Sequence, residues 1–356
     1  MSVWFPFDLP GPSALYVTFY IVTLAIHVAF MNYVLAGSAY VAIATALARG
    51  RSQDDILVRI LRDWLPFALG CAITAGVAPL LFVQVLYKEN FYTANLLLFH
   101  RWMAMIPVLI AGFYLLYLGK SKALETWGHR AASATAVAAF ACFAVTAYSF
   151  TENHLLAVDR TEWVAMYASG QMFYLRAAVF LRALLWITGS LPIMAVTLAW
   201  QLRRSNDDAS QATRRLAVIA MTGLVASVAF ALLYAMASEQ AAHAQSLARS
   251  APGHQAIIAA ALLAQFIVWA WAWHTCHLDR RMLLIASLAA LVTVFAVALV
   301  REALRLSALT SDALFELHAR AAETGGLAAF LIFFVINAAV IATCLRITQQ
   351  GLRKND

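Results

Sequence analysis

Charged residues are scarce in this sequence: they make up 12% of the 356 residues, whereas hydrophobic residues make up 63%. Soluble domains carry about 25% charged residues, so the composition excludes an ordinary soluble fold. The net charge of +7 does not indicate nucleic-acid binding, because the Lys and Arg residues are spread along the chain and form no basic patch.

Several common cofactor motifs are missing. The four cysteines form no Cys-x-x-Cys-His sequence, which excludes a covalent c-type haem site. The chain has neither a phosphate-binding P-loop nor a His-Glu-x-x-His zinc motif. No Asp or Glu lies in the interior of the expected membrane spans, and this argues against a proton-coupled transporter.

Long apolar runs are what the sequence does have. Each is long enough to cross the ~30 Å hydrocarbon core of a bilayer as a helix. No linker or repeat divides the chain, so residues 1–356 are predicted to form a single all-α integral-membrane domain, a polytopic bundle of about nine transmembrane helices. The predicted spans are 14–47, 65–87, 96–118, 130–151, 174–201, 215–237, 255–273, 282–302 and 326–347.

The distribution of positive charge predicts the orientation of these spans. Most of the 25 Lys and Arg residues fall in alternate connections, and such an excess marks the cytoplasmic side. The N-terminus is therefore expected outside and the C-terminus in the cytoplasm of a bacterial inner membrane.

Five ionisable residues fall within or at the edge of the outer half of the predicted bilayer. An arginine at the centre of a membrane helix costs roughly 2.5–3.5 kcal/mol on insertion scales, so such a residue indicates a functional site. Arg182 is expected to be the deepest of the arginines. The five residues are His27, His100, Arg101, Arg182 and Arg301.

Three further residues join this candidate site. Met31 shares a helix face with His27 by i, i+4 spacing, and the fourth span brings Tyr148 and Glu152 to the same level. Arg, Tyr and His side chains suit haem propionates or the head group of a quinone. His27 is the candidate axial ligand of a haem b iron.

Simpler interpretations of the same residues exist. The arginines could extend to the lipid head groups or pair with Glu152 or Glu302, and His27 could bond a neighbouring helix. The remaining histidines are expected to be solvated, because they lie in connections or at helix ends. They are His129, His154, His243, His254, His274, His277 and His318.

Four stretches resemble subunit I of the cytochrome bd-type quinol oxidases, and the resemblance is best over residues 15–200. ALYVTFYIVTLAIHVAFMNYVLAGSAYVA resembles the first helix of that family. FALGCAITAGVAPLLFVQVLY and FYTANLLLF resemble its second and third helices, and RALLWITGSLPIMAVTLAW its fifth. The resemblance implies a nine-helix bundle with b- and d-type haems near the outer face and the oxidation of quinol coupled to reduction of oxygen.

The chain also departs from the family pattern. The histidine ligand of the first helix falls near Val17, and Leu97 and Met105 stand where the third helix has glutamates. Phe180 or Leu185 stands at the haem histidine of the fifth helix. The quinol-binding loop is reduced to 238–254, and its Gly-Arg-x-Pro-Trp signature is absent. These departures argue against a complete oxygen reductase.

The sequence predicts an electron-transfer subunit of an oxidoreductase (quinol or cytochrome) complex, with an outer-leaflet haem b or quinone site. Its expected partners are the lipid bilayer and a periplasmic c-type cytochrome or other redox subunits. Two alternatives remain at this point. One is a cofactor-free anchoring subunit of a membrane redox complex, and the other is a transporter for an anion or small solute.

Overall fold

The structure is a computed structural model that describes residues 5–47, 55–121, 124, 126–203, 210–237, 252–309, 312–324 and 326–353. Every regular element among these residues is a helix, which confirms the predicted all-α class. His243 lies outside the described residues.

Among the described residues, ten long helices build the bundle, and their bounds extend several of the predicted spans. They are α1 (Gly11–Leu47), α2 (Ile56–Leu86), α3 (Lys88–Met103), α4 (Met105–Lys120), α6 (His129–Val158), α8 (Ala177–Leu202), α9 (Ser210–Ala237), α11 (Pro252–Thr275), α12 (Arg280–Leu309) and α14 (Gly326–Arg353). Shorter helices lie in the connections: η2 (Arg160–Glu162), α7 (Trp163–Ser169) and α13 (Asp312–Glu323).

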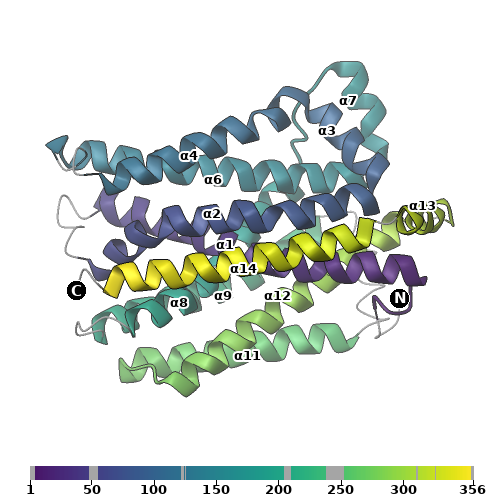
Figure 1. The fold of residues 1–356 in the computed structure, drawn as a ribbon. Coiled ribbons are helices and arrows are strands. Elements are labelled where there is room, and N and C mark those ends of the chain that lie inside the picture. Colours follow the sequence, from purple (N-terminus) through teal and green to yellow (C-terminus); the bar gives the residue numbers. More distant parts are fainter. Residues whose placement is uncertain are drawn as a thin grey trace.

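Eight of the described helices are long and apolar enough to cross a membrane, and α3 with α4 forms a bent pair that brings the number to nine if the pair is one span. These helices indicate an integral membrane protein. The two ends of the chain lie at opposite ends of the bundle (Figure 1). The end that carries α13 is called the outer end below, following the orientation predicted from the positive charges.

The third span is broken. Its two halves, α3 and α4, are bent by 40°, and Phe99 has a φ of 30° inside α3. By contrast, α2 runs as one helix through Gly76 and Pro79. In Figure 1, the distance between α4 and α2 grows toward the outer end of the bundle, and α3 then leads back to the end of α2.

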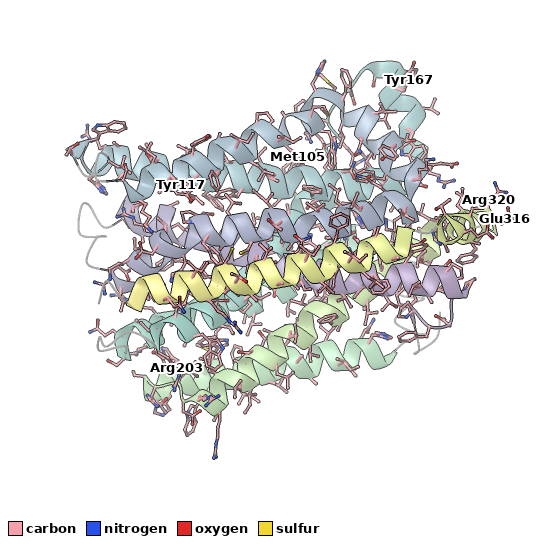
Figure 2. All side chains as sticks on the ribbon, in the orientation of Figure 1. Met105, Tyr117, Tyr167, Arg203, Glu316 and Arg320 are labelled. Carbon is pink, nitrogen blue, oxygen red and sulfur yellow. The ribbon has the colours of Figure 1, made fainter. Side chains whose placement is uncertain are left out.

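The helix α1 is central, since it packs against α2, α6, α8 and α12. An apolar core fills the inner half of the bundle, with Leu57, Leu61, Leu198 and Trp269 among its fully buried members. Charged side chains mark the two ends of the bundle. Arg203 lies at the inner end, and the Glu316–Arg320 pair lies on α13 at the outer end (Figure 2).

At the outer end, α13 packs against α1 and α2. Its anchor is His318, which is fully buried, although the sequence analysis placed it in solvent. The Nε2 atom of His318 lies 3.0 Å from the Leu86 carbonyl oxygen, which can only accept a hydrogen bond. Nε2 therefore carries the proton, and Nδ1 accepts from the Ser13 hydroxyl at 2.8 Å.

The helices α8 and α9 pack closely at Gly223. A Cβ atom there would lie 2.7 Å from the Leu191 Cβ and 2.9 Å from the Thr188 carbonyl oxygen. Gly223→Ala is therefore expected to destabilise the protein by about 1–3 kcal/mol, since the helix backbone must shift. The thermal midpoint in detergent measures this. Gly70→Ala, where no atom lies within 4 Å, is the matched control; equal midpoints for the two variants would contradict the packing.

Burial lowers the pKa of His318 below its usual value of 6.5. Because the unfolded chain binds this proton more readily, stability is complete above about pH 6.5 and is lost as the pH falls toward the lowered pKa. We expect the thermal midpoint to fall between pH 7.5 and 5.5, and His318→Gln to make that fall smaller. An unchanged pH profile in His318→Gln would exclude this residue as the cause.

Candidate functional site

A cavity of about 410 Å³ lies in the outer half of the bundle, between α1, α2, α4, α6, α8 and α12. Its walls are mostly apolar. They include Leu24, Val28, Leu80, Phe143 and Trp186. Four of the eight residues predicted for the site line it: His27, Met31, Arg182 and Arg301.

His27 stands on α1 in the apolar part of the cavity. Its Nδ1 atom lies 2.9 Å from the carbonyl oxygen of Ala72 on α2. Because a carbonyl oxygen only accepts, Nδ1 must carry the proton of the neutral ring, and Nε2 keeps its lone pair. A backbone carbonyl on the second ring nitrogen is a common arrangement of metal-ligating histidines.

Gly76 makes room for this ring. A Cβ atom on Gly76 would lie 2.9 Å from Cε1 and 3.0 Å from Nδ1 of His27. Gly76 follows Ala72 by one helical turn, so the same face of α2 supplies both the acceptor and the space. Met31 lines the cavity one turn further in on α1.

The outer part of the cavity is polar. Arg301 on α12 donates from Nη2 to the Tyr20 hydroxyl at 2.5 Å. Tyr20 lies seven residues from His27, or about 10 Å along α1. The cavity therefore has a histidine near its middle and an arginine at its outer end.

Arg301 belongs to a buried cluster around Glu302, which is fully buried. The Glu302 carboxylate lies 3.8 Å from Arg301 and 3.6 Å from Arg305, and it accepts from the Tyr87 hydroxyl at 3.3 Å. The Arg305 guanidinium stacks 3.8 Å from the centroid of the Tyr87 ring. One carboxylate thus serves two arginines, both of which line the cavity.

Arg182, on α8, is the third cavity arginine and is 8% exposed. It donates from Nη1 to the Tyr234 hydroxyl at 3.1 Å. No carboxylate of the described residues forms an ion pair with it. Three arginines at this end of the cavity therefore face one carboxylate, which leaves two positive charges in excess.

The cluster also holds buried atoms that lack a hydrogen-bond partner, among them Oε1 of Glu302 and two arginine donors. The Nε atoms of Arg301 and Arg305 are buried and make no hydrogen bond to any described residue. A buried charged donor without an acceptor is costly. The polar end of the cavity is therefore suited to an anion that carries two charges and several acceptor oxygens.

The other predicted residues lie elsewhere. Arg101 pairs with the fully buried carboxylate of Glu152, and its guanidinium lies 5.8 Å from the centroid of the Tyr148 ring. Glu152 also accepts from the backbone N–H of Tyr174 at 2.6 Å. His100 is exposed next to Phe99, 4.1 Å between ring centroids. Arg101 ties α3 to α6 through Glu152 and Tyr148, and none of these four predicted residues lines the cavity.

Three members of the site were not predicted from the sequence. His154, expected in a solvated connection, lies in α6 and lines the cavity, because α6 extends to Val158. Arg305 also lines it, and its i, i+4 spacing from Arg301 was the available signal. Tyr20, seven residues before His27, could have been found by the same helical periodicity.

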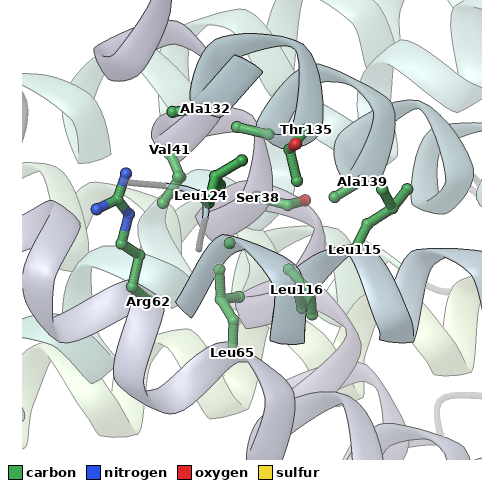
Figure 3. Close-up of a pocket in the computed structure, with 12 residues that line it drawn as sticks. Ser38, Val41, Arg62, Leu65, Leu115, Leu116, Leu124, Ala132, Thr135 and Ala139 are labelled. Atoms are coloured by element: carbon green, nitrogen blue, oxygen red, sulfur yellow. The ribbon is translucent and has the colours of Figure 1, made fainter. Parts of the chain in front are cut away.

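A second cavity, of about 30 Å³, lies toward the inner end near Arg62 and Ser38 (Figure 3). Its volume suits about one water molecule. It shares no lining residue with the larger cavity, so the larger cavity is the candidate site.

Within the described residues, no three His, Cys, Asp or Glu side chains come together as ligands for a free metal ion. A haem differs, because its porphyrin supplies four of the iron ligands and the protein adds only axial ones. The cavity fits such a group, with an available imidazole nitrogen, an apolar wall and surplus arginine donors.

Comparisons with family models, with curated proteins and with solved structures find no match to this chain. The resemblance to the oxidase subunit thus stays a prediction from the sequence, and the proposals that follow rest on the cavity.

The ion pair of Arg101 and Glu152 is expected to stabilise the folded protein. Arg101→Met leaves the buried Glu152 carboxylate without its counter-charge and should destabilise the protein by about 3–5 kcal/mol. The double variant Arg101→Met/Glu152→Gln should recover most of this loss. Thermal midpoints of the three proteins measure the effect. A double variant no more stable than Arg101→Met would contradict the pairing.

Proposed function

We propose that this chain is a membrane electron-transfer subunit that holds one b-type haem in the outer cavity. The observation that carries the proposal is the hydrogen bond from His27 Nδ1 to the Ala72 carbonyl. It leaves Nε2 free as a ligand and fixes the tautomer and the ring plane. When bound, a haem supplies a one-electron carrier.

Each part of the cavity has a role in this proposal. His27 would hold the iron through Nε2, and Gly76 keeps the space for its ring. Arg182, Arg301 and Arg305 would neutralise the two propionates. Neutralised propionates no longer stabilise the oxidised iron, which carries one more positive charge than the reduced iron, so the reduction potential is expected to be higher than in a haem site without these arginines.

A quinone, the other cofactor class expected from the sequence, fits the charges less well. It is neutral and would leave both excess charges uncompensated. An anion transporter is also less well supported. The cavity lining reaches inward only to residues such as Val34, Leu35 and Leu69, and the apolar core packs beyond them.

The site suggests where the subunit works. The haem would lie in the outer half of the bundle, within reach of a redox protein outside the membrane, such as a periplasmic c-type cytochrome. The expected location is a bacterial inner membrane, and the chain would act as one part of an oxidoreductase complex.

The test is the absorption spectrum of the protein purified in detergent from cells supplied with a haem precursor. The wild type is expected to show a Soret band and a dithionite-reduced α band. His27→Ala should retain at least about tenfold less haem per protein, because the iron loses its ligand. His277→Ala, an exposed histidine at the inner end, is the control and should retain the full spectrum.

Gly76→Ala sharpens this test. The added methyl group would press on the His27 ring, so the variant should shift or weaken the haem bands while His27 is still present. A colourless wild-type protein, or a full spectrum in His27→Ala, would overturn the proposed function.

A further inference from the structure

We infer that the cavity is loaded sideways from the bilayer, through an opening between α2 and the α4–α6 pair. The occupant is then a membrane-dissolved amphiphile with an anionic head and an apolar body. Haem and a fatty acid share this chemistry. The inference rests on the proposed function only for the identity of the occupant.

The first observation is where the exposed lining residues lie. Three side chains line the cavity and are also exposed on the outside of the bundle: Val77 is 53%, Ile73 47% and Phe150 41% exposed. Ile73 and Val77 share one face of α2, and Phe150 comes from α6. They lie within membrane-spanning helices, so this side of the cavity faces lipid.

The second observation is the broken third span. Toward the inner end, Leu115 and Leu116 of α4 lie close to Leu65 of α2 around the small cavity (Figure 3). At the other end, α3 follows α2 directly after Tyr87. The 40° bend between α3 and α4 carries the span away from α2 between these two points (Figure 1). A straight span packed along α2 would close this side.

The third observation is that the outer end offers little access to water. Tyr20, Tyr87, Glu302 and Arg305 are each at most 3% exposed. Above them, α13 is held by His318 to Ser13 and to the carbonyl of Leu86. Among the described residues, the exposed part of the lining therefore faces the lipid side and not the outer end.

The apolar opening and the arginines behind it favour one class of ligand, an amphiphile with an acidic head group. A molecule dissolved in the outer leaflet meets an apolar entrance, slides its body toward His27 and Met31, and brings its acidic groups to the arginines. A small hydrophilic anion would have to cross the same apolar entrance without its hydration shell, which is strongly unfavourable.

The first test follows loading with haem as the probe. Haem-loaded phosphatidylcholine vesicles are mixed with apoprotein in proteoliposomes, and the Soret band is recorded over time. The double variant Ile73→Phe/Val77→Phe narrows the opening and should slow loading at least about fivefold. Ile43→Phe, an exposed apolar position on α1 away from the cavity, is the control. Equal rates in all three proteins would overturn the route.

The second test does not depend on haem. Trp186 lines the cavity. Its fluorescence is obtained by subtracting the emission of the Trp186→Phe variant from that of the wild type. A nitroxide-labelled stearate added to the membrane should quench this signal over time, and the Ile73→Phe/Val77→Phe variant should slow the onset of the quenching. Acrylamide in the aqueous phase should quench it weakly.

The two tests separate the two proposals. If haem does not bind but the stearate quenches Trp186 through the opening, the proposed function fails and the lateral route stands with a fatty-acid-like ligand. If acrylamide quenches Trp186 strongly, or the stearate does not, the route is overturned even where haem binds.

Discussion

A guanidinium group inside a membrane must meet a counter-charge or a polar partner, and this requirement organises the outer half of the bundle. Arg101 meets it with one carboxylate of its own, that of Glu152. Arg301 and Arg305 meet it only in part, because they share the carboxylate of Glu302. Arg182 has a tyrosine hydroxyl as its hydrogen-bond partner. The arginines whose charge the described residues balance only in part are the ones that line the cavity. Their unbalanced positive charge favours a negatively charged ligand there.

The same site depends on two local features of α2. Ala72 offers its carbonyl to His27, and Gly76 leaves space for the ring. The neighbouring span bends away and leaves one wall of the cavity exposed at Ile73 and Val77. The inferred path from the lipid to the polar end of the cavity thus passes three features in turn. They are the apolar opening, the oriented imidazole of His27 and the excess of arginine. The proposed haem, with its apolar body and two acidic groups, would match each step of this path.

Much of the bundle could be predicted from the sequence, because membrane helices must be apolar over their whole length. The expected runs correspond to the long helices of the structure, although α6 and α12 continue beyond the ends expected for them. That extension is why His154 is part of the cavity and not of a loop. His318 was wrongly expected in solvent, since nothing in the local sequence of α13 indicates that the helix folds over the outer end.

The sequence by itself determined that the protein is an all-helical membrane bundle with arginines and a histidine at membrane depth, because hydropathy and charge are properties of each segment alone. Only the tertiary structure decided which of these residues meet. Arg101 and Glu152 neutralise one another across 51 positions of sequence, whereas His27, Arg182 and Arg301 surround one cavity. The physical reason is that helix packing brings together residues from distant segments, and the pairing of each charge depends on those neighbours.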